Sequence, residues 1–238
     1  MSNLPTCWWC GKAADSREHK FKASELRASH GPEWRGESAV VHGSFGGQHQ
    51  EVRGPKADGL KWPPSMCKDC NNRRSQPFDR AYDQFLRFLE LNEAAVLTRG
   101  ELSFRDVFGK EWRAGRRNLI KYWVKHVCCR AVEVGLSVPP ATCVYLDSQS
   151  SSGAPPHIRM RLMINEAVID MAGADSLHLG SYFTDALGWS DPRSGELIGF
   201  DAAVGWGWLA LAYEFRIPDP SGATTFPRAR LRLDRSGG

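Results

Sequence analysis

Four of the seven cysteines fall into two short pairs that could hold a metal ion. The pairs are Cys7-Trp-Trp-Cys10-Gly11 and Cys67-Lys-Asp-Cys70. A C-x-x-C pair places two thiolates on one tight turn, and two such turns supply the four corners of a tetrahedral zinc site. Because no corner stays open, we expect a structural rather than a catalytic Zn²⁺. The alternatives are that one pair is redox-active or that the two pairs never meet.

Two further short motifs lie next to these cysteines. Glu18-His19 follows the first pair, and Asn71-Asn72 directly follows the second. A neutral imidazole can accept a proton from water near neutral pH, and carboxylate and amide oxygens are ligands that Mg²⁺ accepts. Such a set of groups could activate water against a phosphodiester and stabilise the charge that develops on the phosphate.

The order C-x-x-C-G, acidic residue plus His, C-x-x-C-N and then a helix resembles the His-Asn-His (ββα-metal) endonuclease superfamily. It looks particularly like the branch of phage Holliday-junction-resolving endonucleases, in which Asn directly follows the last zinc cysteine. The resemblance covers roughly residues 5–92. It implies a zinc-stapled, treble-clef-like ββα-metal module. It also implies that His19 is the general base, and that Glu18 and Asn71 are ligands of a catalytic Mg²⁺ or Mn²⁺.

The sequence departs from this family pattern in three places. The acidic ligand is Glu where Asp is more usual, and Asn stands where the third motif position is often His. The segment LKWPPSMC has no match for the middle Asn that orients the base in relatives, so the residue that orients His19 is unidentified. On the residues alone, His19 and Glu18 could be ordinary surface groups. Asn71 could cap the following helix, with Asn72 as the alternative ligand.

The bulk composition is typical of a soluble globular protein. Hydrophobic residues make up 42% and charged residues 24% of the 238 residues. No apolar run is long enough to span a membrane, and the start MSNLPTCWWC lacks the apolar stretch of a signal peptide. We therefore expect a cytoplasmic protein with reduced cysteines and no membrane partner.

Two helices are predicted after the cysteine pairs. The first covers about residues 75–92, with Ser75 as its cap and Pro77 in its first turn. The second covers about residues 110–134. Basic residues recur along the second helix opposite its tryptophans: Arg113, Arg116, Arg117, Lys121 and Lys125. This basic stripe is either a solvated face or, beside a nuclease motif, a surface that contacts the phosphate backbone of nucleic acid.

The chain is expected to be an α+β protein in three parts. These are a zinc-bound nuclease module in residues 1–95, a basic helical connector in residues 96–140 and a β-rich domain of unassigned role in residues 141–238. The strand-like runs HIRMRLMI, SLHLGSYF and WGWLALAYEFRI support the β-rich part, and PRARLRLDRSGG predicts a basic tail or an edge strand. A short strand is also expected at Ser38–His42.

The function predicted from these features is Mg²⁺- or Mn²⁺-dependent hydrolysis of phosphodiester bonds, with DNA expected over RNA as the nucleic-acid substrate. One alternative is a non-catalytic zinc module that binds nucleic acid or a protein partner. A toxin or defence effector whose C-terminal part senses a partner is another. That C-terminal part could also bind a protein partner or form a homodimer, and the sequence leaves the choice open.

Overall fold

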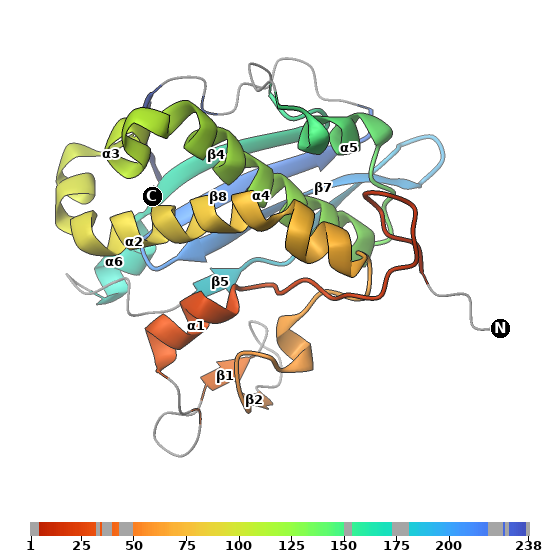
Figure 1. Ribbon diagram of the computed structural model, residues 1–238, viewed down its shortest axis with the longest axis horizontal. Helices are drawn as coiled ribbons and strands as arrows, with labels where there is room; N and C mark the ends of the chain where they lie inside the picture. Colours follow the sequence, from red (N-terminus) through yellow and green to blue (C-terminus); the bar gives the residue numbers. More distant parts are fainter. Residues whose placement is uncertain are drawn as a thin grey trace.

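The computed structural model describes residues 5–31, 34, 40–42, 50–149, 154–172, 181–218, 226 and 229–236. Within these residues, a six-stranded sheet carries two long helices, α2 and α4, on one face (Figure 1). Short helices, a small hairpin and the cysteine-bearing loops lie beside this two-layer unit. The protein is thus a mixed helix and sheet structure, and the expected fold class is confirmed at this coarse level.

Helix α2 (Gln76–Arg99) has one apolar face, which its periodicity predicts. Buried residues recur on it every three or four positions: Phe78, Tyr82, Phe85 and Leu89. Ser75 is at the N-cap, where the sequence places it, but its hydroxyl donates to the carbonyl oxygen of Asn71 (2.7 Å) and does not cap the first turn. The helix continues beyond the predicted end, across a kink at Asn92, which has non-helical backbone angles.

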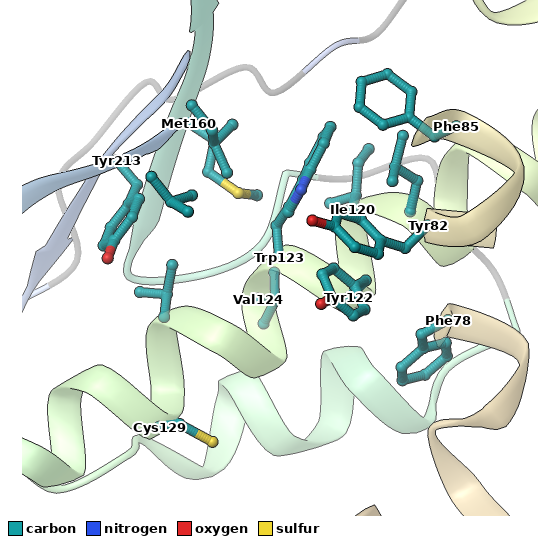
Figure 2. Packing of buried hydrophobic residues seen from close by; sticks show 14 of the residues in the cluster. Phe78, Tyr82, Phe85, Ile120, Tyr122, Trp123, Val124, Cys129, Met160 and Tyr213 are labelled. Atoms are coloured by element: carbon teal, nitrogen blue, oxygen red, sulfur yellow. The ribbon is translucent and has the colours of Figure 1, made fainter. Parts of the chain in front are cut away.

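Helix α4 (Trp112–Glu133) is enclosed by the rest of the fold over most of its length. Every residue from Leu119 to Ala131 is buried. One side of the helix packs on α2, and Figure 2 shows its Trp123 among the buried residues of this layer. Trp123 also lies against Trp206 of the sheet, with ring centroids 6.4 Å apart. Burying side chains of this size contributes about 1.5–3 kcal/mol each to stability. The helix therefore joins the sheet to α2 and to the loops that carry the cysteines.

The basic residues in the middle of α4 do not form the exposed stripe that their spacing predicts. Lys121 and Lys125 are only 3% and 1% exposed. Lys121 donates a hydrogen bond to the carbonyl oxygen of Leu146 (2.9 Å) near the end of helix α5 (Pro140–Asp147). Other elements cover this side of α4, so the prediction of a solvated face is wrong at these two lysines, and neither ammonium group is exposed for phosphate contact.

The arginines in the first half of α4 are more accessible than these lysines. Arg113 is exposed, and Arg117 is half-buried. Arg116 is also half-buried, and its guanidinium donates to the carbonyl oxygen of Phe226 (2.7 Å). A contact with nucleic acid stays a prediction for these three residues.

The large sheet has the strand order β10-β4-β8-β7-β5, and β6 also pairs with β7. Its pairs are antiparallel except for β10, which is parallel to β4. The strands are β4 (Ile158–Asn165), β5 (Ser181–Phe183), β6 (Leu187–Ser190), β7 (Leu197–Trp206), β8 (Leu209–Arg216) and β10 (Asp234–Ser236). Side chains of β4 alternate between buried and more exposed positions, because successive residues of a strand face opposite sides of the sheet.

Three of the segments predicted to be strands contain strands in the structure. HIRMRLMI corresponds to β4, and the tail contains the edge strand β10. The run WGWLALAYEFRI contains β8, but it begins with a tight turn in which Gly207 has a φ of 52°. The preceding strand β7 was not predicted, because Gly, Ala and Asp are poor strand formers. Gly205 of β7 leaves room for the ring of Tyr182, which a Cβ atom would approach to 2.1 Å.

The remaining elements are short. Strand β1 (Val40–His42), which falls within the strand predicted at 38–42, pairs with β2 (Gln50–Val52), and β3 (Glu101–Ser103) pairs with β9 (Arg230–Arg232). The short helices are α1 (Ala23–His30), η2 (Asp58–Leu60), η3 (Asp69–Arg74), α3 (Phe104–Phe108), η4 (Gly109–Glu111) and α6 (Glu166–Ala172). Of these, η3 is a π-helical turn that leads directly into α2.

Buried apolar residues from all three predicted parts of the chain belong to one contiguous cluster, which extends from Cys7 to Leu233. The division into parts at residues 95 and 140 stays a prediction. None of the helices in the described ranges has a segment long and apolar enough to cross a membrane.

Helix α1 is attached to the rest of the fold through a buried carboxyl group. Glu25 is 9% exposed, and its Oε2 accepts a hydrogen bond from the hydroxyl of Tyr82 (2.7 Å). The hydroxyl of Ser181 contacts Oε1 of the same carboxyl. Burial raises the pKa of Glu25 to about 7, although the Tyr82 hydrogen bond and the charge of Lys22 act in the opposite direction.

This raised pKa predicts that stability depends on pH. Between the ordinary pKa of 4.5 and about 7, the folded protein binds a proton that the unfolded chain has lost, so stability falls as pH rises through this window. The full effect is about 3 kcal/mol. Glu25→Gln should remove this part of the slope and be more stable than wild type at pH 8. Urea unfolding of wild type and Glu25→Gln at pH 5 and pH 8 gives the free energy of unfolding of each protein at each pH. An equal change in this free energy between the two pH values for both proteins would contradict the prediction.

Candidate metal centre and adjoining pocket

The four cysteines of the two C-x-x-C pairs come together in the structure. The Sγ atoms of Cys7, Cys10, Cys67 and Cys70 all lie within 4.8 Å of one another, and Cys10 and Cys67 are 3.6 Å apart. Tetrahedral zinc with Zn–S distances of about 2.3 Å places its thiolates about 3.8 Å apart. The cluster therefore fits a Zn²⁺ site, and the two pairs do meet, against the alternative of separate pairs.

Local backbone geometry prepares both halves of this cluster. After the first pair, Gly11 has a φ of 75° and donates its N–H to the carbonyl oxygen of Cys7 (2.8 Å), which closes the tight turn. In the second pair, the N–H of Cys70 points at the sulfur of Cys67 (3.5 Å). Arg74, one turn further along η3, donates to the sulfur of Cys70 (3.2 Å). Donors of this kind stabilise thiolates that bind a metal.

Trp9, inside the first pair, packs the cluster against two helices. Its ring is 6% exposed and stacks on Phe78 of α2, with centroids 6.0 Å apart. Its indole N–H donates to Asp147 at the end of α5 (3.1 Å), and the guanidinium of Arg74 lies 4.5 Å from the ring centroid. The cysteine cluster is thus fixed at the end of the helical layer where α2 begins.

The other three cysteines lie outside the cluster. Cys128 and Cys129 are fully buried in α4, as expected for small apolar residues. Cys143 is half-buried, and its sulfur lies 3.4 Å from the carbonyl oxygen of Trp8.

Two extended segments and a helix place the predicted site residues beside the cysteine cluster. Residues 16–20 run antiparallel to residues 60–66 through backbone hydrogen bonds, one of which joins Trp62 N–H to the Glu18 carbonyl oxygen (2.8 Å). The second segment then continues through Cys67 and Cys70 into η3 and α2. This arrangement brings the Glu18-His19 dipeptide next to the start of the helix, although more than fifty residues separate them in the sequence.

An open pocket of about 580 Å³ lies at this junction. Glu18, His19, Asn71 and Asn72 all line it, so the structure brings together the residues that the motif singles out. Asp79 of α2 also lines the pocket and was not predicted. Asp79 stands eight positions after Asn71, which is about two helical turns. This spacing, which places two residues on the same helix face, was the one feature of the sequence that could have indicated Asp79 as a pocket residue.

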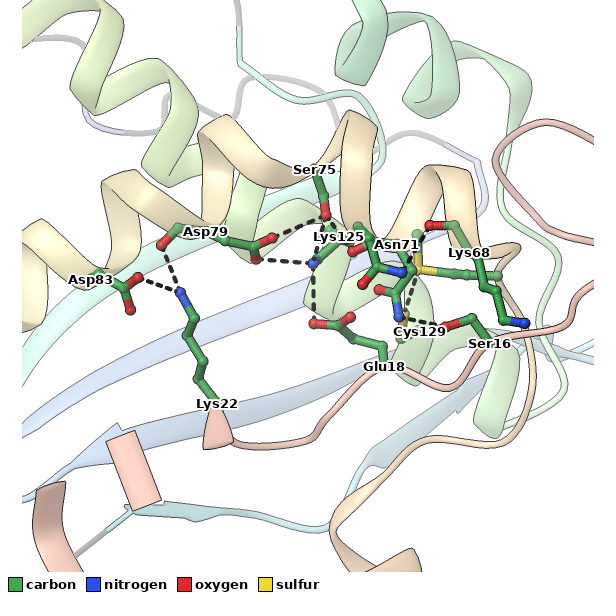
Figure 3. Close-up of polar contacts among 12 residues, drawn as sticks. Ser16, Glu18, Lys22, Lys68, Asn71, Ser75, Asp79, Asp83, Lys125 and Cys129 are labelled. Carbon is green, nitrogen blue, oxygen red and sulfur yellow. Dashed lines mark hydrogen bonds and ion pairs between the residues drawn. The ribbon is translucent and has the colours of Figure 1, made fainter. Parts of the chain in front are cut away.

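The carboxylate of Glu18 forms an ion pair with a buried lysine. Its Oε1 lies 3.1 Å from Nζ of Lys125, a residue of α4 that lies behind the pocket lining (Figure 3). The same ammonium group lies 3.2 Å from Oδ1 of Asp79 and 3.3 Å from Oγ of Ser75. Burial alone would lower the pKa of Lys125, but the two carboxylates outweigh this effect and raise it, so Lys125 carries its charge at neutral pH.

Asn71 lies inside η3, so it caps neither η3, which begins after Lys68, nor α2, whose N-cap is Ser75. Its side chain is buried, and Nδ2 donates to Oγ of Ser16 (2.9 Å). Its Oδ1 has no hydrogen-bond partner among the described residues. Such a group is costly to bury without a ligand. By contrast, Asn72 is exposed and donates to the carbonyl oxygen of Lys68 (3.0 Å).

His19 is half-buried and lines the same pocket. Its Nε2 is buried and makes no hydrogen bond within the described part of the chain. No described residue therefore orients the ring through Nε2. Burial lowers the pKa of His19, and the nearby charges of Lys61 and Lys125 lower it further. The imidazole is therefore neutral at pH 7 and can accept a proton.

No family model matches this chain. Among curated proteins and among solved structures, none is significantly similar to it. The resemblance to the His-Asn-His endonucleases therefore rests on the motif residues themselves, and a function has to be inferred from their geometry.

The donor groups at the pocket suit a hard divalent cation. Mg²⁺ binds oxygen ligands, and the unpartnered Oδ1 of Asn71 and the carboxylate of Glu18 are of this kind. The ion pair with Lys125 already compensates the charge of Glu18, however. In the described ranges, the four cysteines are the one set of three or more His, Cys, Asp or Glu side chains whose ligand atoms lie this close together.

Proposed function

We propose that this protein is a metal-dependent endonuclease that hydrolyses phosphodiester bonds in nucleic acid, with the pocket beside the cysteine cluster as its active site. The observation that carries the proposal is the convergence of Glu18, His19 and Asn71 on one pocket, next to four cysteines that could bind zinc. Two antiparallel segments followed by a helix present these residues, in the order that a ββα-metal module requires.

Each residue has a role that its surroundings support. Asn71 and Glu18 would hold a divalent ion, which supplies positive charge for the developing charge on the phosphate and the leaving oxygen. His19 would accept the proton of the attacking water, since its ring lines the pocket and is neutral. The acceptor would be Nδ1, because Nε2 is buried. The cysteine cluster, with zinc bound, would keep the two extended segments in place against η3.

The surroundings of the pocket suit a phosphate backbone. Arg17 and Lys61 line it, and both lie near the carboxylate of Asp58, at 2.7 and 3.9 Å. A substrate phosphate would take the place of this carboxylate as their partner. Water is the nucleophile, so the reaction needs no 2′-hydroxyl group, and DNA is the proposed substrate. Arg113, Arg116 and Arg117 remain candidates for further backbone contacts. We also propose that the C-terminal region binds a protein partner or forms a homodimer. The proposed location is the cytoplasm.

Cleavage of supercoiled plasmid tests this function directly. Wild-type protein that contains about one zinc per chain should nick plasmid in Mg²⁺ or Mn²⁺. It should be inactive in the presence of a chelator too weak to remove zinc. Activity on duplex, single-stranded and branched DNA and on RNA should be compared. A zinc-loaded protein that cuts none of them with either metal would contradict the proposal.

One observation favours a second candidate, a non-catalytic zinc module that binds nucleic acid or a protein. The ion pair between Glu18 and the buried Lys125 is also what a purely structural role for Glu18 would produce. Divalent-metal binding separates the two candidates, since the binding module needs zinc but no second metal. If the module is correct, the zinc-loaded protein binds nucleic acid equally well with and without Mn²⁺.

A further inference from the structure

Lys125 is an unexpected side chain behind the pocket, where it contacts the lining residues Glu18 and Asp79. It is 1% exposed, it lies on a helix far along the chain from the motif, and its ammonium group contacts Glu18, Asp79 and Ser75 at once. A buried lysine is costly unless its charge is compensated, and here two carboxylates compensate it. Figure 3 shows the three partners around this ammonium group, with Asp79 to its left, Glu18 below it and Ser75 above it.

This arrangement fixes the position of the Glu18 carboxylate. Glu18 is held by Lys125, and Lys125 is held in turn by Asp79 and Ser75, both at the start of α2. Asp79 is itself fixed by the hydroxyl of Ser75, which lies 3.1 Å from Oδ2. The flexible side chain of Glu18 therefore keeps one position beside the pocket before any ligand arrives.

The same contacts also limit the charge that Glu18 offers to a metal. A divalent ion bound to Glu18 would lie near the positive charge of Lys125 and would be repelled by it. Mg²⁺ in nucleic-acid enzymes is commonly held by one or two carboxylates together with oxygens of the substrate phosphate. The negative charge that the pocket lacks would then come with the substrate.

We propose that Lys125 is a positioning residue that fixes Glu18 and weakens divalent-metal binding to the free protein, so that metal and substrate phosphate bind together. This inference rests on the proposed function. By linkage, a phosphate that strengthens metal binding is itself bound more tightly when the metal is present. A merely structural Lys125 would predict that its removal leaves metal affinity unchanged or weakens it.

Mn²⁺ binding to zinc-loaded protein without nucleic acid, followed by electron paramagnetic resonance, tests the role of Lys125. Lys125→Met leaves two carboxylates without their partner, so the decisive variant is Lys125→Met/Asp79→Asn, which keeps the net charge of the protein. It should bind Mn²⁺ roughly tenfold more tightly than wild type. Adding Glu18→Gln to the double variant should abolish this gain.

Two single variants act as controls. Lys22→Met removes a lysine that lines the pocket and pairs with Asp83 at 2.7 Å, and it should leave Mn²⁺ affinity close to that of wild type. Asp79→Asn alone keeps the pair between Lys125 and Glu18 and should not tighten Mn²⁺ binding. Thermal melting identifies the variants that fold.

The possible results separate this inference from the proposed function. A folded double variant with Mn²⁺ affinity equal to or lower than that of wild type overturns the role of Lys125, whether or not wild type cuts plasmid. If no variant binds Mn²⁺ through Glu18, the inference is also overturned. The proposed function fails with it only if wild type cuts no nucleic acid.

Discussion

Replacing His19 with alanine should lower the rate of phosphodiester cleavage by about 10²–10⁴-fold, the usual contribution of a general base. The imidazole lines the pocket beside Glu18 and Asn71. Because Glu18 is held by Lys125 and Asn71 by Ser16, the loss of the ring should not displace either of them. The change should therefore act on the chemical step, and zinc content and DNA binding should stay near wild-type values.

The measurement is plasmid nicking in Mn²⁺ under single-turnover conditions, with zinc determined for each preparation. His30→Ala is the matched control, since His30 is a half-buried histidine at the end of α1 that does not line the pocket. Added imidazole should restore part of the activity of His19→Ala but not change that of the control. Wild-type cleavage rates in zinc-loaded His19→Ala would remove His19 from the mechanism.

The second large effect is expected from the cysteine cluster. Cys67→Ser removes one of four thiolates from a closed site, and serine is a poor zinc ligand at neutral pH. Zinc content should fall well below one per chain. Zinc binding of this type is worth about 10–16 kcal/mol in isolated zinc-finger peptides, so its loss should open the segments that it joins. Hydrogen exchange should increase in residues 5–20 and 60–75, and cleavage activity should be lost.

Strands β4, β7 and β8 bury many apolar side chains against α2 and α4, so they should keep their protection in Cys67→Ser. Cys143→Ser is the control, since Cys143 is half-buried and lies outside the cluster. It should keep about one zinc per chain. If Cys67→Ser retains a full zinc and wild-type exchange in both segments, the cluster does not hold them together through a metal.

Much of the local architecture could be predicted from short stretches of sequence. The spacing of the cysteine pairs implied four convergent thiolates, because each C-x-x-C turn is formed by its own few residues. The recurrence of Phe78, Tyr82, Phe85 and Leu89 predicted α2, because helical periodicity is a local property of the chain. The motif also singled out Glu18, His19 and Asn71, and the fold places all three at one pocket.

Features that depend on the packing of distant elements could not be predicted from the sequence. The lysine spacing of α4 resembles an exposed face, but α5 covers Lys121, and the pocket carboxylates enclose Lys125. Strand β7 has weak local propensity and forms because β8, β5 and β6 supply its hydrogen bonds.

Asp79 lines the pocket because the fold places the segment that carries Glu18 beside the start of α2. The amino-acid sequence therefore determined which groups could perform chemistry and which local turns and helices carry them. The tertiary structure decided which charges face water and which face one another, because burial and pairing depend on the elements that cover each side chain.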